Sequence, residues 1–362
     1  MGANRSQHFV PRAYLKHFSA ALNPRVIGLW NIDNALYVEQ APTKSQCAKP
    51  FLYGRDELEI ILGEIEGKYD QWVGRGVLAV PPIVVYDIDQ FVRFFVMLQY
   101  LRTEYALMRI RAQFNLLDQL AQIPTDSEHS LETIDTSDTT LARDGVRMAL
   151  DVQGIVSDLA MVFVKNRSAQ AFVTCDDPVV FSSRVYTQRL RATNFGFGST
   201  GAFFYLPLSP SIAVLLYDRD AYAVPKQNRY WAVMDRDVDA KALNELVFLK
   251  ARENIYFRDR SDFDEARFQV LKERRLTEWQ AGSILAPVGE RPGETIYRQV
   301  NDAPESGGYF ITTSSRFPIP ERWPSILRMR SPVIGYTNGS AAGHVRRHVA
   351  ALEGIRARRV RL

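Results

Sequence analysis

The sequence predicts an α+β fold in which long helices pack on an antiparallel or mixed sheet around a single interdependent core. Three observations predict it: 46% of the 362 residues are apolar, strand-like runs come in hairpin-like pairs, and helical periodicity fills the segments between those pairs. The regular strand-helix alternation that indicates a parallel sheet is missing. We expect the sheet to consist of residues 26–38, 161–174, 202–217 and 255–258.

The N-terminal segment HFVPRAYLKHF predicts a short helix. Pro11 fits its first turn, where a missing N–H costs no hydrogen bond. The residues expected on its buried face are Tyr14, Leu15 and Phe18. Residues 26–32 and 35–38 then predict a hairpin, because turn-forming residues separate two strand-like runs.

Two long amphipathic helices are predicted next, over residues 55–73 and about 89–121. The second would be about 45 Å long at 1.5 Å per residue. An apolar stripe with helical spacing marks the first and consists of Leu58, Ile61, Leu62, Ile65, Tyr69 and Trp72. The core residues expected on the second are Phe91, Phe94, Leu98, Leu101 and Tyr105.

Residues 124–140 hold five acidic residues and no lysine or arginine, which predicts an acidic surface loop. A third helix is expected over about 141–159. The apolar runs 161–164 and 171–174 predict a hairpin that leads to the tetrapeptide CDDP.

Residues 202–217 predict two strands with a corner at PLSP, because each proline removes a donor from the sheet. Helices are expected over 239–252 and 261–279. We divide the chain into three parts: an α+β core domain (1–285), a Gly/Pro/Arg-rich extension (286–343) and a basic C-terminal segment (344–362).

Composition narrows the class of protein. No run approaches the ~20 apolar residues of a membrane span, and the N-terminus has no apolar secretory core, so we expect a cytoplasmic protein that does not contact a membrane. Cys47 and Cys175 are too few for a disulfide framework. Motifs of nucleotide-driven motors, dinucleotide oxidoreductases, ordinary zincins and α/β-hydrolases are absent. The oligomeric state is left open.

The formal net charge of +4 is unevenly distributed. From His344 onward there are six arginines and one glutamate, so the other 343 residues sum to −1. Residues 345–356 predict a short amphipathic helix with arginines on its outer side, which could attract nucleic acid or another acidic partner. The alternative is a solvated tail without a partner.

Six segments carry a family resemblance, and they occur in the order QHFVPRAYLKHF, LEIILGEIEGKY, LQYLRTEYALMR, CDDP followed by VV, YLPLSP and LNELVFLKARENIYF. In this order they resemble the domain of unknown function 4238 family, over roughly residues 7–258. That family typically opens with His-(Phe/Tyr)-Val-Pro and carries a Ser-Asp-Asn-Pro-like motif. Here Cys175 and Asp177 replace the typical Ser and Asn. The resemblance implies no reaction.

His8, Arg12 and Tyr14 are the first candidate site residues. An imidazole and a guanidinium four residues apart could face one cleft, with His8 catalytic, Arg12 a bidentate anchor for phosphate or carboxylate, and Tyr14 a further substrate contact. Alternatively, His8 caps the helix and Arg12 pairs with an acid.

Glu59 and Glu66 lie two helical turns apart, with Gly63 between them. They are candidate metal ligands if they lean toward each other, with Glu66 also a candidate catalytic residue, and solvated acids otherwise. Because glycine inside a helix costs ~1 kcal/mol relative to alanine, Gly63 suggests the close approach of another group.

Arg102 interrupts the core side of the longest helix, so we expect a buried carboxylate partner among Glu59, Glu66 and Asp176. A structural ion pair and a substrate clamp are equally compatible with it. Asp176 and Asp177 end a predicted strand; Asp176 is a candidate catalytic carboxylate and metal ligand, or caps the loop.

Two weaker candidates complete the set. Cys175 as a nucleophile lacks any surrounding protease signature. Asn244 is a poor helix former inside a predicted helix, so it bonds the site or faces solvent.

Two functions fit these residues. The first is an intracellular hydrolase acting on a phosphate-containing substrate, such as a nuclease, with Mg²⁺ or Mn²⁺ held by Glu59, Glu66 and Asp176. The second is a non-catalytic recognition or partner-binding protein in which the polar residues form a buried network. Convergence around an open pocket would favour the first, and mutual pairing in a sealed interior the second.

Overall fold

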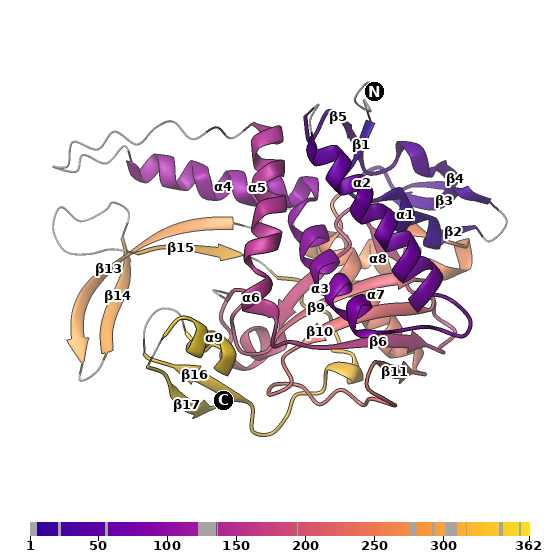
Figure 1. Ribbon diagram of the computed structural model, residues 1–362. Helices are drawn as coiled ribbons and strands as arrows, with labels where there is room; N and C mark the ends of the chain where they lie inside the picture. The colour runs from indigo at the N-terminus through magenta and orange to yellow at the C-terminus, as the bar shows by residue number, and fades with distance from the viewer. Residues whose placement is uncertain are drawn as a thin grey trace.

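The computed structural model confirms an α+β fold (Figure 1). The residues that it describes are 6–20, 23–54, 57–121, 135, 137–193, 195–275, 280–291, 294–300, 310–315, 317–339, 343–354 and 356–362.

A five-stranded sheet in the order β11-β6-β10-β9-β8 lies at the centre. Its strands are β6 (Ala160–Asn166), β8 (Val180–Ser183), β9 (Ala202–Ser209), β10 (Ile212–Tyr217) and β11 (Trp231–Met234). Strand β11 runs parallel to β6 and the other neighbours are antiparallel, so the sheet is mixed. The predicted pair within 202–217 is confirmed as β9 and β10.

A second sheet has the order β2-β3-β12-β7, with β4 beside β3. Its strands are β2 (Ser19–Ala20), β3 (Asn23–Asn31), β4 (Leu36–Pro42), β7 (Thr174–Cys175) and β12 (Asn254–Phe257). The predicted N-terminal hairpin is confirmed as β3 and β4.

The prediction of one sheet is wrong, because its segments divide between these two sheets. The predicted hairpin of 161–164 with 171–174 is also wrong. Strand β6 takes its partners from β10 and β11, and the short β7 pairs with β12. Local periodicity identified the strands and could not assign their partners.

Helices cover both faces of the central sheet (Figure 1). One cluster joins Phe163 and Val214 to α3 (Tyr86–Leu101) and α5 (Asp138–Asp151). The other joins their sequence neighbours Val162 and Leu215 to α7 (Asp237–Lys250) and α8 (Glu265–Leu271). Because successive strand residues point to opposite faces, one sheet anchors both clusters.

The remaining helices begin with α1 (Arg12–Leu15), whose N-cap is Pro11 and which buries Tyr14 and Leu15; the third predicted core residue, Phe18, is buried in the 3-10 turn that follows (Lys16–Phe18). The others in this part of the chain are α2 (Glu57–Tyr69), continued by a π-helical stretch (Asp70–Val77), α4 (Glu104–Ala121) and α6 (Gln153–Val156). The stripe predicted on α2 is only partly buried, since Ile61 is 49% exposed.

Two predictions for residues 89–140 compare with the structure as follows. The prediction of one long helix over 89–121 is wrong, since α3 ends at Leu101 and α4 begins at Glu104. The acidic segment 124–140 falls largely outside the described residues, and its last three residues belong to α5.

Smaller elements complete the described chain. They are the pair β1 (Ser6–His8) and β5 (Ala48–Pro50), the sheet of β13 (Gln280–Arg291), β14 (Glu294–Val300) and β15 (Phe310–Ser315), the pair β16 (Ile334–Thr337) and β17 (Arg358–Arg361), and α9 (Arg347–Leu352). In the described part of the chain, every helix is too short or too polar to cross a bilayer.

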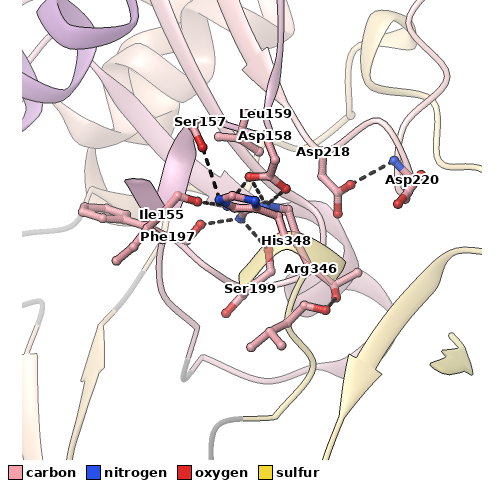
Figure 2. A network of polar contacts seen from close by, with 12 residues as sticks. Ile155, Ser157, Asp158, Leu159, Phe197, Ser199, Asp218, Asp220, Arg346 and His348 are labelled. Atoms are coloured by element: carbon pink, nitrogen blue, oxygen red, sulfur yellow. Dashed lines mark hydrogen bonds and ion pairs between the residues drawn. The ribbon is translucent and has the colours of Figure 1, made fainter. Parts of the chain in front are cut away.

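The C-terminal segment is attached to the core through Arg346 (Figure 2). Its guanidinium is buried and forms an ion pair with Asp158 at 2.9 Å. It also donates to the carbonyl oxygens of Ile155, Phe197 and Ser199. The prediction that the arginines of this segment face outward is therefore wrong for Arg346.

Gly145 in α5 sits against the end of α3. An added Cβ would lie 2.4 Å from the carbonyl oxygen of Leu101. At Gly63 an added Cβ would meet nothing within 4 Å, so no described residue makes the close approach predicted there. The glycine that permits close packing of helices is therefore Gly145.

We predict opposite effects of alanine at these two positions. Gly145→Ala should lower the free energy of unfolding by about 1–3 kcal/mol, because a backbone carbonyl must move. Gly63→Ala, in open space inside a helix, should raise it by about 0.5–1 kcal/mol. Urea unfolding of both variants measures this, and equal effects would contradict the packing described.

Candidate functional site

Helices α3 and α4 meet at three consecutive residues, Arg102, Thr103 and Glu104, which we call the joint. The Thr103 hydroxyl accepts from the Ala106 N–H at 3.2 Å, so it caps the first turn of α4. Each side chain of the joint contacts a different part of the chain. The joint therefore contains the predicted Arg102 and contacts two further predicted site residues, His8 and Glu66.

Arg102 is fully buried, and the predicted carboxylate partner is confirmed as Glu66. The Nη2 atom lies 2.9 Å from Glu66 Oε1 and donates to the His8 carbonyl at 2.6 Å. Its Nε atom donates to the Tyr53 hydroxyl at 3.2 Å. This guanidinium thus connects β1, α2 and α3.

No hydrogen bond joins the side chains of His8 and Arg12. The His8 Nδ1 atom lies 3.0 Å from the Gln46 carbonyl oxygen, and burial lowers the pKa of the imidazole. Arg12 is exposed, and within the described chain its guanidinium has no hydrogen-bond or ion-pair partner. The anchoring role predicted for Arg12 remains a prediction.

Tyr14 and Asn244 use their polar groups inside the protein. The Tyr14 hydroxyl donates to the Pro207 carbonyl at 2.7 Å and lies 2.6 Å from Thr174 Oγ1. The Asn244 side chain donates to the Ala171 carbonyl oxygen and accepts from the Val173 N–H. It neither faces solvent nor lies in a pocket described below, and it connects α7 to the chain leading into β7.

Asp177 lies buried behind the joint. Its Oδ1 accepts from the Thr103 hydroxyl at 2.9 Å, and its Oδ2 lies 2.6 Å from Lys250 Nζ and 3.9 Å from Arg109 Nη1. Burial lowers the pKa of Lys250 to about 8, with Asp177 acting in the opposite direction. Sequence reasoning missed Lys250, although a lysine at the end of the apolar run LVFLK was a usable signal.

Asp176 is held by three successive backbone amides. Its carboxylate accepts the N–H groups of Arg252, Glu253 and Asn254 at 2.9, 2.7 and 3.1 Å. Burial raises the pKa of Asp176 to about 6, although the amide hydrogen bonds act to lower it. Asp176 therefore caps a loop, as the second alternative predicted, but the loop is residues 252–254, which are distant in the sequence.

A polar pocket of about 280 Å³ opens beside Asp176; we call it the joint pocket. In its wall Glu104 forms ion pairs with Lys49 at 2.5 Å and Arg252 at 2.9 Å. Glu253 also lines it. His8, Glu59 and Glu66 are not among its lining residues.

The predicted metal ligands are not brought together. Glu59 accepts from the Gln7 amide at 3.0 Å, Glu66 pairs with Arg102, and Asp176 accepts the three amides. Within the described ranges, no group of three or more His, Cys, Asp or Glu side chains is placed to hold a metal ion. The Mg²⁺ or Mn²⁺ dependence stays a prediction without a ligand set.

Cys175 is fully buried, and burial raises the pKa of its thiol well above the ordinary value. A nucleophilic cysteine needs the thiolate form. The environment of Cys175 therefore disfavours the nucleophile already judged weak from the sequence.

A second pocket, of about 500 Å³, lies where α3 begins, next to β6 and the loop before β11. We call it the cationic tyrosine pocket. Its charged lining residues are Arg93, Arg219, Lys226, Arg229 and Asp89, and its aromatic ones are Tyr86, Tyr217 and Tyr230. Four cations thus face one acid in its lining.

Sequence reasoning missed this pocket. In the segment YDRDAYAVPKQNRYW, residues 217–231, basic and aromatic residues alternate, a pattern typical of binding sites for nucleic acids and nucleotides. Arg93 adds its charge from a helix far away in the sequence. Only the fold places that helix beside the 217–231 segment.

A family described as "Protein of unknown function (DUF4238)" matches residues 6–261, which is more than half of the chain. The joint and both pockets lie inside this range. No curated protein and no solved structure matches the chain.

We predict that the two arginines expected to clamp substrate differ sharply in their effect on stability. Arg102→Met should lower the free energy of unfolding by roughly 3 kcal/mol, because it removes one partner of a buried ion pair. Arg12→Ala, at an exposed position, should change it by less than about 0.5 kcal/mol. Denaturant unfolding measures both, and equal effects would show that the Arg102 contacts do not stabilise the fold.

Proposed function

We propose that this chain, which belongs to the DUF4238 family, is a recognition protein that binds a phosphate-bearing ligand in the cationic tyrosine pocket. The observation that carries the proposal is the gathering of Arg93, Arg219, Lys226 and Arg229 around one acid, Asp89. Guanidinium and ammonium groups are the usual protein partners of phosphate.

Among the described residues, three of the four cations in this pocket, Arg219, Lys226 and Arg229, lack an ion-pair partner. Asp89 is already paired with Arg93 at 2.6 Å. Arg219 is exposed, and its guanidinium has no acidic partner among the residues that the structure describes. The pKa of Lys226 is lowered first by burial and then by the charges of Arg219 and Arg93. A bound phosphate would relieve this repulsion.

Part of the pocket is ordered before a ligand binds. Arg93 donates to the Leu159 carbonyl at 2.6 Å while it pairs with Asp89, so its position is fixed. The Lys226 ammonium lies 5.6 Å from the centre of the Tyr217 ring. Cations held in place lose less entropy when a ligand arrives.

The ion pairs around the joint support a recognition role over catalysis by the residues first suspected. The buried Arg102 pairs with Glu66, and the buried Asp177 pairs with Lys250. They position strands and helices and do not line either pocket.

We predict that thymidine monophosphate binds more than tenfold more tightly than unphosphorylated thymidine. Arg219→Ala and Lys226→Ala should each weaken monophosphate binding about tenfold, because each removes a charge-assisted contact. Arg147→Ala removes an equally exposed charge from α5 and should leave binding unchanged. Isothermal titration calorimetry measures all four proteins, and equal affinity for thymidine would refute phosphate recognition.

One observation favours hydrolysis as a second candidate function. Asp176 lines an open pocket with a pKa of about 6, suited to a general base near neutral pH. Lys49 and Arg252, which converge on Glu104, would hold an anionic substrate group there. In this reaction Asp176 takes a proton from the attacking water.

The hydrolase candidate predicts a rate that rises as the pH increases through about 6, because protonated Asp176 cannot accept a proton. Asp176→Asn should lower the rate at least ~100-fold. Asp218→Asn is the matched control, since Asp218 is also buried and accepts two backbone amides away from the joint pocket. Phosphomonoester turnover is measured with and without Mg²⁺ or Mn²⁺. Ligand binding without turnover would leave recognition as the function.

A further inference from the structure

The cationic tyrosine pocket has a neighbour of about 470 Å³ across the loop that leads to β11. The exposed Lys165 and Arg167 and the half-buried Trp231 line this neighbouring pocket. Its described lining contains no acidic residue. It therefore extends the positive surface beyond the first pocket.

The same two chain segments line both pockets. In the loop 226–231, Lys226, Arg229 and Tyr230 line the first pocket, and the residues between and after them line the second. On β6, Met161 lines the first and Lys165 the second. Four residues of strand separate these positions by about 13 Å. The two pockets thus form one strip along β6.

The strip combines cations with aromatic rings. Its six cations are Arg93, Arg219, Lys226, Arg229, Lys165 and Arg167, and its four aromatic residues are Tyr86, Tyr217, Tyr230 and Trp231. Asp89 is the acid in the lining. Two exposed acids, Asp87 and Asp220, directly follow the lining residues Tyr86 and Arg219 in the sequence. Six cations still face three acids when both are counted.

We infer that this strip binds single-stranded nucleic acid, with successive phosphates on its cations and bases on those of its aromatic side chains that reach solvent. The inference rests on the proposed function, because the cationic tyrosine pocket would hold the first nucleotide. Tyr86, which is 61% exposed, offers a ring to a base at one end, and the half-buried Trp231 offers part of its ring at the other. Duplex bases are already stacked, so the aromatic residues favour a single strand. An acidic polypeptide would use the cations and leave the rings unused.

The test compares a fluorescent ten-nucleotide oligothymidine with thymidine monophosphate. The oligonucleotide should bind at least tenfold more tightly, and its affinity should fall as NaCl rises, because each phosphate contact releases counterions. Lys165→Ala/Arg167→Ala should weaken oligonucleotide binding about tenfold and leave the monophosphate affinity within twofold. Arg143→Ala/Arg147→Ala removes two exposed charges from α5 as the matched control.

The outcomes separate this inference from the proposed function. Binding of the monophosphate with no gain for the oligonucleotide, or no effect of the Lys165/Arg167 double variant, overturns the strip and leaves the first pocket standing. Absence of binding by either probe overturns both. Equal affinity for a duplex of the same sequence or for polyglutamate overturns the assignment to single-stranded nucleic acid.

Discussion

The burial of Arg102 is the constraint on which the arrangement of the N-terminal half depends. A guanidinium removed from water needs acceptors, and here the Nε and Nη2 atoms find them on β1, Tyr53 and Glu66. Because α3 ends just before this residue, the next two side chains reach Asp177 on one side and Lys49 and Arg252 on the other. One interruption of a helix thus brings together segments more than 100 residues apart.

The sequence indicated this constraint only in part. A charged residue on the core side of an apolar helix predicts a buried partner, and the partner was among the candidates named for Arg102. The interruption itself was not predictable, since LQYLRTEYALMR contains neither proline nor glycine and has helical periodicity throughout. The division of strands between two sheets was equally hidden, because periodicity reports which face of a strand is buried and carries no information about its neighbour.

Electrostatics distinguishes the two pockets more clearly than shape does. At the joint pocket the cations Lys49 and Arg252 meet the acids Glu104, Glu253 and Asp176, so its surroundings are balanced or slightly negative. The cationic tyrosine pocket has an excess of positive charge and little internal pairing. Of the site residues predicted from the sequence, Asp176 alone lines the joint pocket. The second is assembled from ordinary arginines and tyrosines whose proximity is a property of the fold.

The turn between α6 and β6 links the C-terminal segment to the cationic tyrosine pocket. From one side Arg346 holds this turn through Asp158 and the Ile155 carbonyl (Figure 2). From the other side Arg93 holds it through the Leu159 carbonyl. Ser157, between these contacts, lines the cationic tyrosine pocket. The C-terminal segment, which lies outside residues 6–261 that match the family, therefore stabilises a wall of the cationic tyrosine pocket, which lies inside that range. A substitution in the C-terminal segment would therefore alter the shape of the pocket with no change to a residue of its lining.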